Sequence, residues 1–158
     1  MNKIEVYTPK ENKEEKEIRI FLAGVIDQGN SYDWQKDIIE RIKKWTKPHH
    51  NIIIYNPRYD NFGKSVALED QIKWEQEHLD KADYIMMFLD SSSKAPVSLL
   101  ELGLYSKTKK LSVFCHKDFY REKNVELTCL KYGIPFFEGQ DRDTLLGQLE
   151  DRINFLTR

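Results

Sequence analysis

Hydrophobic residues in this chain occur as short apolar runs, separated by stretches in which they recur at helical spacing. The runs predict β-strands at residues 18–24, 51–55, 84–89, 111–115 and 134–137. The stretches between them predict helices over about 34–45, about 68–80, the residues that lead up to Tyr105, and 145–156. Strands that alternate with helices in this way indicate an α/β domain with a parallel sheet and helices on both faces.

The ends of these strands indicate where a ligand would bind. In a parallel α/β sheet, ligands lie beyond the carboxyl ends of the strands, at the switch point of the topology. The loops after Gly24, Tyr55, Leu89 and Cys115 should therefore converge on one rim. The first of these loops contains Asp27, is rich in turn and capping residues, and is expected to face the ligand.

The stretch from residue 83 to 105 contains an isolated charge. An apolar run stops at Asp90, crosses a Ser/Pro loop and enters an apolar helix, in which Glu101 is the one charge of the first two turns. Such a carboxylate must be capped, paired or used in chemistry. Ser98-Leu-Leu-Glu101 fits the S-x-x-E capping box, in which glutamate only closes the helix start. Pro96 favours a helix that begins before Ser98, so capping and catalysis both stay open.

A second carboxylate interrupts the helix before that strand. The apolar stripe of this helix has Glu75 in place of one member, and its other members are Leu68, Ile72 and Leu79. The structural explanation is a buried salt bridge from Glu75 to Arg58 or Lys73. Asp90, in turn, could simply begin a turn. Taken together, Glu75, Asp90 and Glu101 are expected to flank one cleft, which suits chemistry that needs a nucleophile and an acid/base.

Composition narrows the classes of protein to which the chain can belong. Its 158 residues suit one well-filled domain, expected over residues 18–158, and the Lys- and Glu-rich residues 1–17 are predicted to form a loosely attached tail. The 25 Lys and Arg nearly cancel the 26 Asp and Glu, which leaves no electrostatic case for a nucleic acid polymer. No run approaches a membrane span and the start is not a signal peptide, so a soluble cytoplasmic protein is expected.

Common cofactor and metal motifs are incomplete in this sequence. Gly63-Lys64-Ser65 looks like the end of a phosphate-binding loop, but Arg58 stands where the leading glycine belongs. The glycines after the first strand make no dinucleotide fingerprint. Cys115 and Cys129 lack a metal-ligand spacing and are predicted to be small core residues. We therefore expect neither a cofactor nor a metal.

Short segments spread over residues 18–137 resemble one known family. They are Ile20-Phe-Leu-Ala-Gly24, Asp33-Trp-Gln35, Asn56-Pro-Arg58, Trp74-Glu75, Ala82-Asp83, Pro96-Val-Ser-Leu-Leu-Glu-Leu-Gly103 and Tyr132-Gly-Ile-Pro135. In combination they are similar to the nucleoside 2-deoxyribosyltransferase-like family. This resemblance implies a flavodoxin-like, three-layer α/β/α fold with a mostly parallel five-stranded sheet. It also implies cleavage of the N-glycosidic bond of a small nucleoside or nucleotide.

The resemblance implies roles for individual residues. Glu101 matches the family's nucleophile, which forms a covalent ester with the anomeric carbon of a 2-deoxyribosyl group, and Glu75 aligns with an acid that assists proton transfer. Asp90 is expected to contact or orient the sugar. Substrate contacts are expected from Phe21, Gly24, Asp27, Arg58, Ser91, Ser98 and Asn124. Asn124, or Tyr120, lies in the segment by which family members complete a neighbouring subunit's site, so a homo-oligomer is expected.

Two positions depart from the family pattern. Ala95 replaces an aspartate six positions before the nucleophile, and Phe21 replaces a tyrosine that orients it. Transfer to another base and hydrolysis by water therefore both stay open. A 5′-phosphate on the substrate also stays open, with Arg58, Lys94 and the serines at 91–93 as its donors. The alternative function is a non-catalytic nucleotide-binding or regulatory module on the same fold.

Overall fold

The computed structural model describes residues 4–6, 17–27, 30–46, 50–58 and 67–158. The incomplete phosphate-loop motif at 63–65 lies outside these residues. The elements in chain order are β1 (Ile4–Val6), β2 (Glu17–Gly24), α1 (Trp34–Lys43), β3 (Asn51–Tyr55), α2 (Leu68–Lys81), β4 (Tyr84–Leu89), α3 (Pro96–Tyr105), β5 (Leu111–His116), α4 (Glu122–Tyr132), β6 (Phe136–Gly139) and α5 (Arg142–Leu156).

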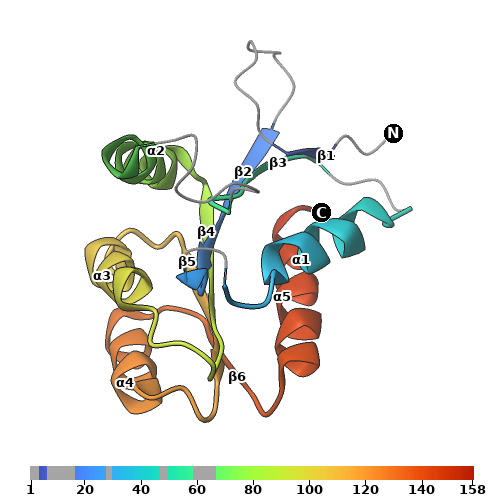
Figure 1. The fold of residues 1–158 in the computed structure, drawn as a ribbon. Coiled ribbons are helices and arrows are strands. Elements are labelled where there is room, and N and C mark those ends of the chain that lie inside the picture. Colours follow the sequence, from blue (N-terminus) through green and yellow to red (C-terminus); the bar gives the residue numbers. More distant parts are fainter. Residues whose placement is uncertain (1–3, 7–16, 28–29, 47–49, 59–66) are drawn as a thin grey trace.

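The strands form one parallel sheet in the order β1-β3-β2-β4-β5-β6 among the described residues. Figure 1 shows α1 and α5 on one face of the sheet and α2, α3 and α4 on the other. This confirms the predicted flavodoxin-like three-layer fold. The chain leaves β2 toward the first face and β4 toward the second, so the switch point lies between the carboxyl ends of these two strands.

The sheet contains one strand more than the sequence predicts. The expectation of a loosely attached tail over residues 1–17 is wrong for Ile4–Val6, which pair with β3 at the sheet edge, and for Glu17, which begins β2. Ile4 packs against the core on the α1/α5 face. Three residues are too few to show a strand period in the sequence. An edge strand of this length forms because it pairs with its neighbour, here β3.

Alternation along the central strands sends side chains into two separate cores. In β4, Met86 and Phe88 belong to the core under α1 and α5, whereas the odd-numbered residues 85–89 belong to the core under α2, α3 and α4. Successive residues of a strand point to opposite faces. Asp90, the residue after β4, therefore falls on the α1/α5 side.

The segment predicted to be irregular after the fourth strand is in fact largely helical. Asn124 lies in the first turn of α4, which spans Glu122–Tyr132 and buries only Val125 and Cys129 on its inner side. Leu127 and Leu130 are exposed instead, so the helix lacks the amphipathic stripe by which it could have been recognised. The helix ends at Gly133, whose positive φ closes the last turn.

The apolar stripe predicted for α2 is also wrong in part. Leu79 is buried, but Leu68 and Ile72 are exposed. The side of the helix that turns inward instead carries polar and aromatic residues at helical spacing, namely Gln71, Trp74, Glu75 and His78. A sheet face covered by such a helix is suited to hold polar groups near the ligand rim.

The remaining expectations about the fold hold with small changes. The last strand spans Phe136–Gly139, two residues later than predicted. Cys115 and Cys129 are buried and free, which confirms their role as core residues. Within the described parts of the chain, no helix is long and apolar enough to span a membrane.

Candidate active site

Glu101 lies too far along α3 to cap it. The helix begins at Pro96, and its N-cap residue is Ala95, which makes no side-chain capping bond. Glu101 is thus in the second turn, and Ser98 is buried in the first turn. The capping-box explanation is wrong, because a capping glutamate must lie three residues after the N-cap. The carboxylate of Glu101 remains available for another role.

Glu75 approaches Glu101 from α2. Its carboxylate accepts a hydrogen bond from Gln71 Nε2 at 3.5 Å, and burial raises its pKa. Among the described residues, no salt bridge joins Glu75 to Arg58 or Lys73, so the structural explanation of this carboxylate is not supported. A partly buried carboxylate without a cation is poised to hold a proton.

Glu75 and Glu101 influence each other's protonation. Burial, with the negative charge of Glu75 as the second cause, raises the pKa of Glu101 to about 8. Two nearby carboxyl groups resist double ionisation, so the pair keeps one proton near neutral pH. Such a pair can supply one ionised and one protonated carboxyl group at the same time, which is the combination that acid and nucleophile require.

Aromatic side chains pack on the sheet face that α2, the helix of Glu75, covers. Trp74, next to Glu75 in α2, lies with its ring centroid 6.2 Å from that of Phe21 on β2. Trp74 also stacks on His78, with ring centroids 4.1 Å apart. The His78 ring in turn meets the Tyr55 ring edge-on, with centroids 4.8 Å apart. Phe21 is buried and lies on the same core as α2 and α3. Phe21 thus offers an apolar surface without a hydroxyl group.

Asp90 does not join the other two carboxylates. It is buried on the α1/α5 side, where its Oδ2 accepts hydrogen bonds from Arg142 Nε at 3.1 Å and Nη2 at 2.8 Å. Its Oδ1 accepts one from the backbone N–H of Ser91 at 2.8 Å. The expectation that Asp90 shares a cleft with Glu75 and Glu101 is therefore not supported, because the strand period turns it to the opposite face.

Arg58 is a structural cation, which binds the segment from Ser31 to Gln35 and is not free to bind a ligand. Its guanidinium donates to the carbonyl and hydroxyl oxygens of Ser31 at 2.9 Å each, to the carbonyl of Tyr32 at 3.1 Å and to Gln35 Oε1 at 3.2 Å, and it pairs with Asp33 at 3.4 Å. Only 7% of its side-chain surface is exposed. These bonds occupy most of its donors, which argues against the predicted phosphate contact.

The loops after β2 and β4 meet at the rim. Gly24 ends β2 with φ of 136°, a conformation that favours glycine, and Val25 N–H donates to Phe88 O at 3.0 Å. Asp27 accepts a 2.6 Å hydrogen bond from Ser93 Oγ, which joins the two loops directly. Ser91 is exposed in the second loop. Gly24, Asp27 and Ser91 thus lie at the predicted rim.

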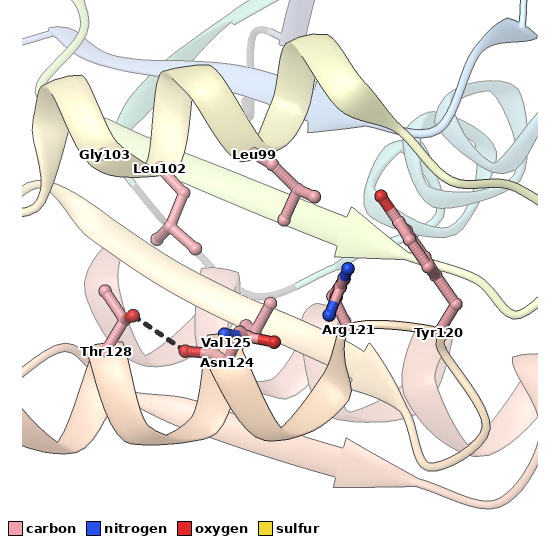
Figure 2. A pocket seen from close by; sticks show the side chains of 8 residues that line it. All are labelled: Leu99, Leu102, Gly103, Tyr120, Arg121, Asn124, Val125 and Thr128. Carbon is pink, nitrogen blue, oxygen red and sulfur yellow. Dashed lines mark hydrogen bonds between the residues drawn. The ribbon is translucent and has the colours of Figure 1, made fainter.

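Asn124 lies in a groove to which the carboxylate pair does not contribute. A groove of about 330 Å³ separates α3 from α4, and Figure 2 shows its lining by Leu99, Leu102, Gly103, Tyr120, Arg121, Asn124, Val125 and Thr128. Its lining includes neither Glu75 nor Glu101. Asn124 is therefore exposed at the α3/α4 groove, and the predicted substrate contact beside Glu101 is not supported within this chain.

Sequence reasoning missed two residues at the rim, Arg142 and Tyr32. Arg142 is the first residue of α5, and its guanidinium lies 4.1 Å from the centroid of the Tyr32 ring. The signal was present in the topology, because a helix that follows the last parallel strand begins at the same rim as the ligand loops. Among the described residues, no group of His, Cys, Asp and Glu could hold a metal ion.

The coupling between the two glutamates predicts a measurable pKa change. In Glu75→Gln, the pKa of Glu101 should fall from about 8, because a like charge is removed while burial remains. A raised carboxyl pKa stabilises the fold below the ordinary pKa of 4.5, and that stabilisation is lost as pH rises to about 8. The free energy of unfolding should thus decline with pH across this window, by at most about 1.4 kcal/mol per pH unit, and the decline should end at lower pH in the variant.

Carbon-detected NMR titration of the glutamate side chains, together with urea unfolding at each pH, measures both effects. Glu77→Gln is the matched control, because Glu77 is an exposed residue of the same helix that pairs with Lys81. An unchanged Glu101 pKa in Glu75→Gln would show that the two carboxyl groups do not interact.

Comparison with known proteins identifies the family of this chain and a solved structure of similar fold. The family model described as "Nucleoside 2-deoxyribosyltransferase like" matches residues 17–119, which include β2, α2 and the α3 carboxylate. A search of curated proteins finds no match. A solved structure described as a conserved protein from Enterococcus faecalis V583 is similar in fold, with a TM-score of 0.55 and 13% identity over 87% of this chain and 99% of that chain. Because the family match spans more than half of the sequence, the chain belongs to the nucleoside 2-deoxyribosyltransferase-like family.

Proposed function

We propose that this protein is an enzyme that cleaves the N-glycosidic bond of (2-deoxy)nucleosides or of their 5′-monophosphates. The observation that carries the proposal is the electrostatically coupled, partly buried pair of Glu75 and Glu101, which lies in the part of the chain that matches the family model. Among the described residues, Glu75 has one long hydrogen bond, from Gln71, and neither carboxylate has a cationic partner. A partly buried pair of carboxyl groups without a cation is costly to a fold unless it is used.

The first step is attack of the ionised Glu101 on the anomeric carbon. The C–N bond breaks with its electron pair on the departing base, the base takes the proton of Glu75, and an ester joins the sugar to Glu101. The negative charge of Glu101 also stabilises the oxocarbenium character of the transition state. In the second step, water or another base attacks the same carbon while Glu75 accepts the proton, and the ester bond breaks to restore Glu101.

The protonation of the resting pair must change before attack. Glu101 has its pKa at about 8 and so is mostly protonated at pH 7, whereas the reaction needs that proton on Glu75. A sugar that develops positive charge beside Glu101 favours the ionised form of this residue. The pair thus works in its one-proton state, and that state is lost above the pKa of Glu101.

Incubation with a panel of deoxynucleosides and their monophosphates, with and without an acceptor base, tests the proposal. Release of free base supports it, and exchange of bases distinguishes a transferase from a hydrolase. If no base is released from any member of the panel, the proposal is wrong. Release from monophosphates alone would identify nucleotides as the substrate.

The second candidate is a non-catalytic nucleotide-binding or regulatory module. The high pKa of Glu101 favours it, because a protonated carboxyl group is a poor nucleophile. Phe21 also lacks the hydroxyl group that would orient this carboxylate. Calorimetry separates the two candidates: a module binds nucleotides equally in the wild type and in Glu101→Gln, without turnover.

We also propose that the protein is a homo-oligomer that acts in the cytoplasm. The two buried free thiols suit a reducing compartment. For the oligomer, the support is the set of exposed aliphatic side chains on the neighbouring helices α3 and α4, namely Val97, Leu100, Leu104, Leu127 and Leu130. Large exposed aliphatic patches mark interaction sites. A second copy on this face would place its Asn124 segment near its neighbour.

Charged substitutions on this face are predicted to dissociate the oligomer. Leu100→Glu or Leu130→Glu, each at a position more than half exposed, should raise the dissociation constant at least about tenfold, because a buried unpaired charge opposes association. Sedimentation velocity over a range of concentrations measures this change. Phe155→Glu on α5, at an equally exposed position, is the control and should leave the assembly unchanged. A monomeric wild type would contradict the proposal.

A further inference from the structure

Arg142 connects the last helix to both loops at the switch point. Its Nε and Nη2 bind Asp90, which holds the start of the β4–α3 loop through the N–H of Ser91. Its guanidinium also lies over the ring of Tyr32, in the loop that follows β2. One side chain thereby contacts the two loops between which a ligand of this fold binds.

The contacts of Arg142 belong to a larger network. Tyr32 donates its hydroxyl hydrogen to Asp37 at 2.7 Å, Asp37 accepts from Arg41 at 2.8 Å, and Arg41 reaches Asp143 on α5 at 3.0 Å. The carbonyl oxygen of Tyr32 accepts a hydrogen bond from Arg58. The backbone of Tyr32 is thus fixed by Arg58, and its side chain is fixed by Asp37 and Arg142. The network connects α1, α5 and both rim loops.

The burial of Asp90 makes the arginine contact strong. Asp90 is 6% exposed, and the Arg142 side chain is 39% exposed. Charge-assisted hydrogen bonds to a buried carboxylate are stronger than neutral ones, and loss of the partner leaves a buried charge uncompensated. The loop from Asp90 to Ala95 leads directly into α3, which carries Glu101. A displacement of Asp90 would therefore be transmitted to the nucleophile.

We propose that Arg142 is a positioning residue, which orders the two rim loops through Asp90 and Tyr32 and so sets the placement of Glu101. This assigns Asp90 a positioning role in place of the predicted sugar contact. It also gives α5 a function, although α5 lies outside the family match at residues 17–119 and on the other face of the sheet from the carboxylate pair. The kinetic part of this inference depends on the proposed function.

The test compares Arg142→Gln, Arg142→Lys and Asp90→Asn with the control Arg152→Gln. Arg152 is a partly buried arginine of the same helix, and its Nε donates to Ser112 Oγ at 3.2 Å. Ser112 lies near the amino end of β5, whereas the rim loops lie at the carboxyl ends of the strands. Arg142→Gln should lower kcat/KM by about 10- to 100-fold, mainly through kcat, because misplaced groups lose rate more than binding. Arg152→Gln should leave both constants unchanged.

Two further readouts separate positioning from general destabilisation. Arg142→Lys should stay low in activity, because an ammonium group cannot bind Asp90 through two fixed donors and stack on Tyr32 together. Asp90→Asn and Arg142→Gln should be non-additive in a double-mutant cycle. Full activity in Arg142→Lys would overturn the inference.

Amide hydrogen exchange supplies a readout that does not require turnover. Exchange in residues 30–33 and 90–95 should accelerate at least about tenfold in Arg142→Gln, as local opening becomes easier, and should stay at the wild-type rate in Arg152→Gln. Unchanged exchange in both loops would overturn the inference. If the wild type releases no base from any substrate, the proposed function fails, and exchange in the two loops alone decides whether Arg142 orders them.

Discussion

Glu101→Gln is expected to lose at least about 10³-fold in base release, because an amide cannot form the glycosyl ester and removal of a nucleophile has effects of this size or larger. The fold should survive, since the substitution removes a buried acid whose ionised form is disfavoured. At alkaline pH the variant should unfold at higher urea concentration than the wild type, because wild-type Glu101 must carry a desolvated charge there.

Two measurements decide this expectation. Steady-state base release gives the rate, and mass spectrometry of acid-quenched protein detects the sugar ester, which should form in the wild type and be absent from Glu101→Gln. Glu77→Gln on α2 should behave as the wild type in both measurements. Wild-type turnover in Glu101→Gln would assign the chemistry to another residue.

Gly24→Ala is expected to cost more than about 3 kcal/mol in the free energy of unfolding, which places it among the strongly destabilising point substitutions. A Cβ atom at this position would lie 2.1 Å from the carbonyl oxygen of Phe88 and 2.8 Å from its nitrogen. Both contacts are with the backbone of β4, which cannot rotate away as a side chain could. The positive φ of Gly24 adds strain for any residue with a Cβ.

The effect should extend from stability to the site. Gly24 ends β2 at the switch point, so the collision would separate β2 from β4 where the rim loops begin. Urea unfolding measures the loss, and Gly147→Ala is the matched control. A Cβ at Gly147 in α5 meets open space, so alanine there should stabilise the protein by about 0.5–1 kcal/mol through better helix propensity. Equal stabilities of the two variants would contradict this account.

Strong local periodicity explains why most elements were predictable. The buried strands β2 to β5 appear as continuous apolar runs, and α1 shows a clear stripe behind the Asp33 cap, whose side chain accepts from Lys36 N–H. In contrast, α4 exposes Leu127 and Leu130 and so has no inward stripe to detect. Its apolar residues are expected to be covered by a second copy, and a single sequence does not mark such residues as surface.

For the site, local pattern was sufficient to select Glu75 and Glu101, because each breaks an apolar environment within its own helix. The pattern alone could not exclude capping by Glu101 or a salt bridge to Glu75. The helix start at Pro96 removed the first explanation, and the second failed because no salt bridge joins Glu75 to Arg58 or Lys73 among the described residues. Both depend on where a neighbouring segment lies, which is a property of packing and not of residue spacing.

Asp90 and Arg142 show the same division most clearly. The sequence identified a polar residue at the end of a central strand and a helix after the last one, and from these the rim of the sheet followed. The side of the sheet that Asp90 faces, and the arginine 52 residues away that binds it, came from the folded arrangement. Contacts between distant segments depend on the register of the strands and the seating of the helices, whereas residue type and spacing determine which elements form and which groups are costly to bury.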